Sequence, residues 1–239
     1  MQRVVIIGAT SGIGRALAIE LSRRGYAVGI AGRRTALLAE LQGGLTGSFA
    51  SMAIDVTQPE EAAQRLDELI TTLGGMDLLV IASGVGVTNP HMDWEPERQT
   101  LAVNVDGFVA MTTVGYRYFS HQGHGHLAAI SSIAGLRGSR FNPAYSASKA
   151  FEMNYLEALR SRGRHDGLDL TVTDIRPGFV NTPMTQGQQG MFWVASVDTA
   201  ARQIAEALIQ KRRVAYITRR WSIIAWLLRH LPSWIFDRI

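Results

Sequence analysis

The first twenty-five residues constrain the fold more than any other stretch of this 239-residue chain. Arg3 to Ile7 is a nearly continuous β-branched run, which is typical of a central parallel strand covered on both faces. It ends in a turn with glycines at positions 8, 12 and 14, and segment 15–24 then has a helical composition and stops at Gly25. Such a turn brings backbone amides to a helix N-terminus, where a pyrophosphate can bind. A plain strand-to-helix turn is the alternative interpretation.

The rest of the chain continues the alternation of strand and helix. Further strands are expected at residues 26–31, 48–54, 76–82, 127–131, 168–175 and 214–218. Further helices are expected at residues 35–42, 58–73, 94–118, 143–162 and 196–212. There is neither an internal repeat nor an interdomain linker. We therefore predict an α/β fold with one domain over residues 1–218, a Rossmann-type doubly wound parallel sheet of seven strands with helices on both faces.

Composition limits the class of protein and the kind of site. Hydrophobic residues make up 46% and charged residues 18%, as in globular rather than disordered proteins. Because the chain has no cysteine, disulfides and cysteine-ligated metal sites are excluded. Histidines 121, 124 and 126 could bind a metal, but the glycines between them favour a helix-ending turn, and structural zinc normally has four ligands. We expect no metal site.

The positive charge is concentrated at the C-terminus. The net charge is +4, yet residues 211–239 hold seven basic residues and one acidic residue, whereas residues 1–210 hold 17 basic and 19 acidic residues. Nucleic-acid binding by the main body is therefore not expected. The N-terminal apolar run is too short for a signal peptide, and no stretch reaches the ~20 apolar residues of a membrane-spanning helix. We expect a cytoplasmic protein.

Three side chains in the middle of the chain form a candidate acid/base set. Tyr145 and Lys149 are four residues apart on an expected helix and project from one face. An ammonium beside a phenol favours the phenolate and lowers the tyrosine pKa. Ser132, at the end of an expected strand, can polarise a carbonyl that the phenol protonates. This set can support hydride transfer when a nicotinamide lies alongside. The alternative is that Tyr145 and Lys149 are ordinary helix surface.

The glycine-rich turn, the segment around Asn104, Ser132 and the Tyr145–Lys149 pair resemble, in this order and spacing, the short-chain dehydrogenase/reductase family. The resemblance runs from about Val4 to Thr218. It implies that Asn104, Ser132, Tyr145 and Lys149 are catalytic, and that Lys149 also binds the nicotinamide ribose. In the family the asparagine kinks its helix and holds a water that links the lysine to solvent. A helix-interior asparagine that bonds locally is the alternative for Asn104.

The same resemblance implies a set of cofactor-binding residues in the turns that follow the strands. They are Gly8, Thr10, Ser11, Gly12, Ile13, Gly14, Arg33, Arg34, Asp55, Val56, Ala82, Ser83, Gly84, Asn104, Tyr145, Lys149, Pro177, Gly178, Val180 and Thr182. In the family, the residue matching Asp55 contacts the adenine, and the Pro177–Gly178 segment lies against the nicotinamide. The Thr182 hydroxyl can meet a pyrophosphate oxygen or the carboxamide. For Asp55, capping of the next helix is the alternative, and Thr57 is also a good cap.

One segment departs from the family pattern. The usual Asn-Asn-Ala-Gly is replaced by Ile81-Ala82-Ser83-Gly84, so the asparagine that normally braces the central sheet is missing. We expect Ser83 to supply part of that bonding, while Gly84 still lets the cofactor approach.

The end of the second expected strand points to the cofactor. An acidic residue there would accept hydrogen bonds from the ribose hydroxyls of NAD, but this chain has Gly32-Arg33-Arg34. The glycine removes repulsion against a 2′-phosphate, and the Arg33 guanidinium can clamp that phosphate and stack on the adenine. The pattern is similar to that of the family members that use NADP, and we predict NADPH. A solvated helix start would account for Arg34 but less easily for the missing acid.

The resemblance also implies a substrate lid and a subunit interface. Residues 183–195 occupy the position of the family's lid, and their aromatic residues and methionines can line an apolar cleft. The expected Tyr145 helix carries an apolar stripe at helical spacing, formed by Ala147, Phe151, Tyr155 and Leu159. In the family this helix packs against its mate, which implies a homodimer or homotetramer. A role in the core alone is the alternative for the stripe.

The tail, residues 219–239, reads as an amphipathic helical extension. Apolar residues cover more than half of the circumference of a helix over 221–231, and Pro232 separates it from a second short helix. The apolar surface can pack on the protein's own cleft or on a partner subunit. Alternatively it can lie in the membrane interface, with Trp221, Trp226 and Trp234 at the headgroups and the arginines on anionic lipid. Residues 228–236 are similar to the C-terminus of the reductase subunits of decaprenylphosphoryl-ribose 2′-epimerases, which act on a lipid-linked keto sugar.

Together these features predict an NADPH-dependent carbonyl reductase, or the reverse alcohol dehydrogenase, with a bulky or lipid-linked substrate. Two interpretations from other classes remain open. One is a non-catalytic NADP-binding sensor or scaffold, which would be expected to lack one of the four catalytic residues. The other is a peripheral membrane protein at the inner face of the membrane, whose tail is its main function.

Overall fold

The computed structural model of the chain describes residues 1–187 and 190–236. Within them the strands are β1 (Arg3–Ile7), β2 (Ala27–Gly32), β3 (Phe49–Ala53), β4 (Leu78–Ile81), β5 (His124–Ile130), β6 (Asp169–Pro177) and β7 (Val214–Ile217). The α-helices are α1 (Gly12–Arg23), α2 (Thr35–Gln42), α3 (Pro59–Leu73), α4 (Trp94–Leu101), α5 (Phe108–Gln122), α6 (Pro143–His165), α7 (Val197–Ile209), α8 (Trp221–His230) and α9 (Ser233–Phe236). A π-helical segment, η1 (Ala102–Gly107), joins α4 to α5, and a 3-10 turn, η2 (Ile133–Leu136), follows β5.

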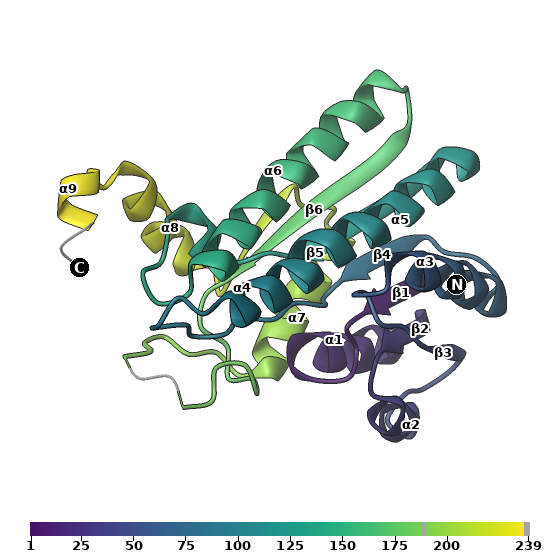
Figure 1. Ribbon diagram of the computed structural model, residues 1–239. Coiled ribbons are helices and arrows are strands. Elements are labelled where there is room, and N and C mark those ends of the chain that lie inside the picture. The colour runs from purple at the N-terminus through teal and green to yellow at the C-terminus, as the bar shows by residue number, and fades with distance from the viewer. Residues whose placement is uncertain (188–189, 237–239) are drawn as a thin grey trace.

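The described strands form one seven-stranded parallel sheet in the order β3-β2-β1-β4-β5-β6-β7 (Figure 1). This confirms the predicted doubly wound fold. The connection from β3 to β4 crosses from one half of the sheet to the other, and the strand order reverses where β4 pairs with β1. A crevice for ligands is expected outside the carboxyl ends of the strands at such a switch point.

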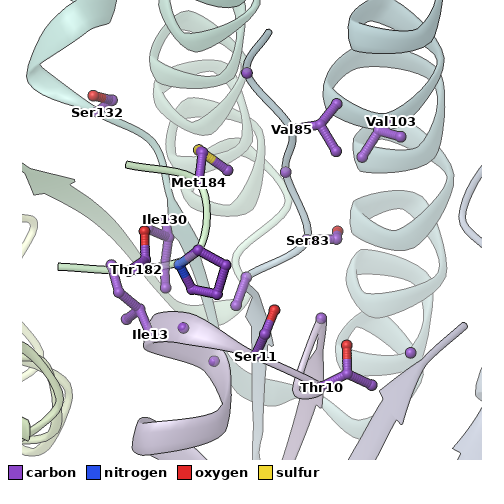
Figure 2. A pocket seen from close by; sticks show the side chains of 18 of the residues that line it. Thr10, Ser11, Ile13, Ser83, Val85, Val103, Ile130, Ser132, Thr182 and Met184 are labelled. Carbon is purple, nitrogen blue, oxygen red and sulfur yellow. The ribbon is translucent and has the colours of Figure 1, made fainter. Parts of the chain in front are cut away.

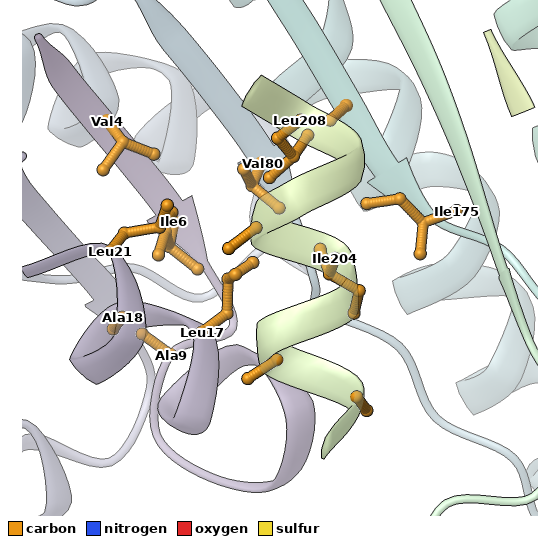
Figure 3. Close-up of a cluster of buried hydrophobic side chains, with 14 of the residues drawn as sticks. Val4, Ile6, Ala9, Leu17, Ala18, Leu21, Val80, Ile175, Ile204 and Leu208 are labelled. Carbon is orange, nitrogen blue, oxygen red and sulfur yellow. The ribbon is translucent and has the colours of Figure 1, made fainter. Parts of the chain in front are cut away.

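Two apolar layers cover the sheet because alternate side chains of β1 point to opposite faces. Val4 and Ile6 pack in one layer with buried side chains of α1, α2 and α7. Figure 3 shows Leu17 and Leu21 of α1 converging with α7 on this face. Val5 and Ile7 pack in the other layer with buried residues of α3, α5 and α6. Both faces of the central strand are covered, which explains its continuous β-branched run.

Several boundaries differ from the sequence-based expectation, two of them close to predicted or candidate site residues. The first helix begins at Gly12 rather than 15, because Ser11 is extended and forms its N-cap, so the glycine-rich turn supplies the first helical amides. β5 begins at His124 rather than 127 because its pairing with β6 continues to the pair His124 and Asp169. His126 is therefore buried beside Thr173, and desolvation lowers the pKa of its imidazole to about 4.

The expected long helix over 94–118 is interrupted. The π-helical segment η1 separates α4 from α5 and contains Asn104, and α5 continues to Gln122. Single π turns within α-helices are frequent at functional sites. The predicted kink at Asn104 thus takes the form of a π-helical segment.

The tail forms two helices that separate at Pro232, as predicted from the proline. α8 packs on η2 and β7 and buries Trp221 and Ala225. Arg137, just after η2, donates to the Leu231 carbonyl at 2.8 Å and lies over the Phe236 ring. The tail is therefore attached to the loop that follows the predicted catalytic serine. Among the helices of the described residues, none is long and apolar enough to cross a membrane.

Candidate active site

A cleft of about 520 Å³ opens along the carboxyl ends of the strands, within the size range of ligand pockets. Figure 2 shows Thr10 and Ser11 of the glycine-rich turn toward one end of it and Ser132 toward the other. Most of the predicted site residues line this cleft: Gly8, Thr10, Ser11, Gly12, Ile13, Gly14, Arg33, Arg34, Val56, Ala82, Ser83, Gly84, Ser132, Tyr145, Lys149, Pro177, Gly178, Val180 and Thr182. The two other predicted residues, Asp55 and Asn104, are not among the residues that line it.

The glycine-rich turn presents unpaired backbone amides to the cleft. Gly8 has φ +91°, and a Cβ at this position would lie 2.4 Å from the Ser83 nitrogen, so only glycine lets the turn pass the end of β4. The first intrahelical hydrogen bond of α1 runs from the Arg15 amide to the Ser11 carbonyl. The amides of residues 12–14 precede it at the positive end of the helix dipole, and the Ser11 side chain does not cap them. This arrangement fits an anion such as a pyrophosphate.

Two arginines stand at the same end of the cleft. The Arg34 guanidinium donates to the hydroxyls of Thr10 and Ser11, both at 2.8 Å, and so lies across the glycine-rich turn. Arg33 points toward Asp55, with 3.9 Å between its Nη1 and the carboxylate, and is largely exposed. Both guanidinium groups are thus close to the end of β2. The sequence pointed more strongly to Arg33, whereas Arg34 is the one held against the turn.

Asp55 shapes the connection between β3 and α3. Its carboxylate accepts hydrogen bonds from the Thr57 amide at 3.0 Å and hydroxyl at 2.8 Å. The alternative that Asp55 or Thr57 caps α3 is wrong, because the N-cap is Gln58 and Pro59 is the first helical residue. The adenine contact of Asp55 stays a prediction.

Asn104 braces the loop that follows β4. Its Oδ1 accepts from the Val85 amide at 2.9 Å, and its Nδ2 donates to the Val85 carbonyl at 2.8 Å and to Ser148 Oγ at 3.0 Å. The expectation that Ser83 braces the sheet is wrong. Its hydroxyl is buried and has no hydrogen-bond partner in the described part of the chain, since the short side chain reaches none. A buried polar atom without a partner in the cleft wall fits a site built for a polar ligand.

Tyr145 and Ser132 come from different elements and line the same cleft. Tyr145 lies in the first turn of α6, where the carboxylate of Glu97 on α4 accepts from the Ala144 amide at 2.8 Å. Ser132 follows β5 and caps η2, accepting from the Ala134 amide at 3.1 Å. Ser132 and Tyr145 are 13 residues apart in the sequence, and the fold places both in the wall of one cleft, as predicted.

Lys149 is buried beside the cleft and is fully engaged by the protein. Its ammonium donates to both carboxylate oxygens of Glu152, at 2.8 and 2.9 Å, and to the Ile130 carbonyl at 3.0 Å. It also lies 5.9 Å from the centroid of the Tyr145 ring. Burial is the largest single effect and would lower the pKa of the lysine, but the charges of Glu152, Tyr145 and Asp174 and the hydrogen bonds to Glu152 together outweigh it, and the pKa is raised. Lys149 therefore stays an ammonium next to the phenol.

Glu152 and a second acid behind the cleft were not identified from the sequence. Asp174 on β6 is fully buried, accepts from Ser131 Oγ and pairs with Arg176 at 2.6 Å. It thus fixes the residue immediately before Ser132. The spacing of three between Lys149 and Glu152 on one helix could have indicated their pairing. The contact of Asp174 with Ser131 joins two segments that are 43 residues apart, so the sequence carried no comparable signal for it.

The opposite wall of the cleft is supported by the tail. Gly178 donates to the Ile217 carbonyl at 2.7 Å, and a Cβ on Gly178 would lie 2.0 Å from Cε2 of the Trp221 indole. Trp221 in turn contacts the rings of Phe179, Phe192 and Trp193. The Pro177–Gly178 segment and the predicted lid therefore rest on the first residue of α8. Of the predicted lid, residues 188–189 lie outside the described residues.

Comparisons with known proteins agree with this geometry. The family model of the short chain dehydrogenases matches residues 2–191. An uncharacterized oxidoreductase of Myxococcus xanthus is 38% identical over 239 residues, which cover 98% of this chain and 94% of the relative. The bovine dehydrogenase/reductase SDR family member 7B is 27% identical over 259 residues, covering 99% of this chain and 79% of the relative.

Solved structures share the fold. A 3-ketoacyl-(acyl-carrier-protein) reductase from Brucella melitensis, complexed with NADH, superposes with a TM-score of 0.81 at 20% identity, covering 90% of this chain and 95% of that chain. ElxO with NADP bound gives 0.79 at 19% identity, covering 90% and 96%.

The fold and the cleft thus define an oxidoreductase class whose members use NAD(P)(H). This chain belongs to the short-chain dehydrogenase/reductase family.

Proposed function

We propose that the protein is an NADPH-dependent reductase that converts a ketone to a secondary alcohol, or catalyses the reverse oxidation. The observation that carries the proposal is that Ser132, Tyr145 and Lys149 line one cleft with an open, uncapped glycine-rich turn. A hydride from the nicotinamide would reach the carbonyl carbon, and a proton would go to the oxygen. The cleft residues would supply that proton and hold the oxygen.

Each polar side chain has a distinct role in this scheme. Tyr145 would donate its phenolic proton to the substrate oxygen, and Ser132 would hold that oxygen by a hydrogen bond. The Lys149 ammonium would stabilise the phenolate that remains and bind the nicotinamide ribose. Asn104 would keep the proton path in place by fixing the loop at Val85, with which it makes two hydrogen bonds.

The preference for NADPH would come from the end of β2. No acidic side chain stands at Gly32, and two guanidinium groups lie within reach of a 2′-phosphate at that end of the cleft. Arginine forms bidentate, charge-assisted hydrogen bonds with phosphates, which adds both energy and geometric selectivity.

The direct test is oxidation of NADPH with a panel of ketones of increasing size, followed by absorbance. Wild-type protein should turn over at least one class, and Tyr145→Phe should lose about 10²–10⁴-fold of that rate while binding NADPH normally. Turnover of Tyr145→Phe within tenfold of wild type would refute the assignment of the acid. Mass spectrometry of molecules that co-purify with Tyr145→Phe would identify the substrate.

A bulky or lipid-linked substrate is the finer proposal, and it rests on the tail. Ile223, Trp226 and Leu227 of α8 are 49–60% exposed, and the neighbouring Arg219 and Arg229 are exposed as well. An apolar face flanked by cations suits the interface of an anionic bilayer. The protein would then be a cytoplasmic enzyme that contacts the inner face of the membrane through α8.

Homo-oligomerisation is proposed from α6. Ala147 and Phe151 of the apolar stripe are exposed, and Phe151 stacks on Tyr155 of the same helix.

A non-catalytic NADP-binding sensor is the rival function. Such a sensor would bind NADPH but would not oxidise it with any ketone of the panel, so the same assay separates the two functions.

A further inference from the structure

The three donors of Lys149 are already used within the protein. An ammonium has three N–H groups, and the structure provides three acceptors within 3.0 Å, namely both Glu152 oxygens and the Ile130 carbonyl. The side chains of Lys149 and Glu152 are only 4% and 1% exposed, so water does not compete strongly for these contacts. Any ligand that takes a hydrogen bond from Lys149 must therefore displace one of them.

Glu152 is the acceptor whose demand for donors can change. A backbone carbonyl keeps its acceptor strength at any ordinary pH, whereas a carboxylate loses its charge when it binds a proton. Leaving an ionised, buried carboxylate short of a hydrogen bond is unfavourable, and a neutral carboxyl in the same place needs fewer donors. A cofactor hydroxyl and a proton on Glu152 are therefore expected to arrive together.

The charges around Glu152 make such protonation accessible. The charged groups that act on Glu152 are Lys149 of its own helix and Asp174 of β6, and Asp106 of η1 is exposed. The Arg176 charge is directed at Asp174, with which it pairs. Burial raises the pKa of Glu152, Lys149 opposes this, Asp174 adds to it, and the result is a pKa of about 7.

We propose that Glu152 is a positioning residue for Lys149, and that binding of the nicotinamide cofactor is linked to uptake of a proton by Glu152. In the ionised state the carboxylate holds the ammonium through two hydrogen bonds. In the protonated state one donor of Lys149 becomes free for the ribose. This inference rests on the proposed function, because it requires that the cleft bind NADPH.

The linkage has a definite sign. Below pH 7 Glu152 is already protonated in the free protein, so binding takes up few protons. Above pH 7 the free protein holds the carboxylate, binding takes up a proton, and the affinity for NADPH falls as the pH rises. The loss can reach about tenfold per pH unit for one linked proton.

Isothermal titration calorimetry of NADPH into the full-length protein measures this directly. Titrations in two buffers of different ionisation enthalpy, at several pH values from 6 to 8.5, give the number of protons bound per cofactor. We expect the uptake due to Glu152, taken as the difference between wild type and Glu152→Gln, to be close to zero at pH 6 and to rise above pH 7. The 2′-phosphate, with its second pKa near ~6, contributes equally in all the proteins compared and cancels in their difference.

Three variants test whether Glu152 is the group that takes up the proton. Glu152→Gln and Lys149→Met should each lose the uptake between pH 7 and 8, because the first has no proton to bind and the second has no ammonium to release. Glu157→Gln changes an exposed carboxyl of the same helix and should behave as wild type. Equal uptake in Glu152→Gln and wild type would overturn the inference.

If the variants of the buried residues Glu152 and Lys149 fail to fold, measurements on wild-type protein alone still test the inference. NADPH binding with no net uptake between pH 7 and 8 would overturn the linkage and leave the proposed function intact. The absence of any binding heat and of any NADPH-induced rise in Tm would refute the proposed function itself. The two failures are therefore distinguishable.

Discussion

At the scale of single residues, the candidate site is a set of side chains whose charge states depend on one another. Lys149 is an ammonium that donates to the Glu152 carboxylate, and it lies 5.9 Å from the centroid of the Tyr145 ring. Ser132 is preceded by a serine that Asp174 fixes from inside the sheet. The residues predicted from the sequence are therefore mostly the cleft-lining members of a larger set of interacting side chains. Glu152 and Asp174 do not line the cleft, but they hold Lys149 and Ser131, which do.

The cofactor preference is a prediction at this scale. Arg34→Ala should reduce the ratio of kcat/KM for NADPH over NADH by at least about tenfold, because a charge-assisted contact contributes ~1.5–3 kcal/mol. Arg33→Ala should reduce the ratio as well, and the double variant should erase the preference.

The comparison needs a variant that removes an arginine elsewhere. Arg23→Ala on α1 lies outside the cleft and should leave the ratio unchanged. Equal kcat/KM for the two cofactors in wild-type protein would show that these guanidinium groups do not select for a 2′-phosphate.

At the scale of elements, the tail is part of the structure that supports the site. The sequence predicted two short amphipathic helices and left open whether their apolar surface packs on the protein's own cleft, on a partner subunit or in the membrane interface. Trp221 is 1% exposed and packs against Gly178, at the end of β6. Because that contact joins residues distant in sequence, no local pattern could reveal it. It also shows why a chain ending at Thr218 would lose core packing as well as a surface.

The contact between β6 and α8 can be tested by overpacking. Gly178→Ala should lower the free energy of unfolding by about 1–3 kcal/mol or more, because the new methyl group meets the indole at van der Waals overlap. Trp221→Ala should also destabilise, by about 3–5 kcal/mol through the cavity it leaves. Urea unfolding followed by fluorescence and circular dichroism gives both values.

The double variant distinguishes the cause. In Gly178→Ala combined with Trp221→Ala, the methyl group no longer meets the indole. The stability lost by the double variant should therefore be smaller than the sum of the losses of the two single variants. Gly138→Ala, where an added Cβ meets nothing within 4 Å, is the matched control and should change stability little. Strict additivity of the two losses would mean that Gly178 is required for some other reason.

The exposed face of α8 gives a second prediction for this element. Full-length protein should co-sediment with anionic vesicles at low salt, less so at high salt because the surface charges are screened. Trp226→Glu should abolish the association. Phe49→Glu, at the opposite edge of the sheet on β3, should leave it unchanged.

Two outcomes would contradict membrane contact by this face. One is that wild-type protein stays in the supernatant at low salt. The other is that Trp226→Glu converts an oligomer into a monomer in solution, which would show that a second copy of the chain covers the face.

At the scale of the whole molecule, the sequence specified the architecture well. The parallel, doubly wound sheet follows from the alternation of strands and helices, and most of the predicted site residues meet at the carboxyl ends of the strands, where parallel sheets bind ligands. What the sequence left open was the partner of each polar group. Ser83 was expected to brace the sheet, but its hydroxyl has no partner in the described part of the chain, and Asn104 holds the loop at Val85 from a π-helical segment that periodicity did not indicate. Such pairings depend on distances of a few tenths of an ångström, which residue type does not determine.

The central claim is that this cleft transfers a hydride and a proton to a ketone. The most direct measurement uses NADPH carrying deuterium at C4 of the nicotinamide, with a ketone substrate from the panel and mass spectrometry of the product. We predict that wild-type protein places one deuterium on the carbinol carbon of the alcohol, from one face of the nicotinamide only, and that Tyr145→Phe binds the same cofactor but forms about 10²–10⁴-fold less labelled alcohol. An alcohol without the label whichever face of C4 carries the deuterium, or equal labelling by wild type and Tyr145→Phe, would contradict the account.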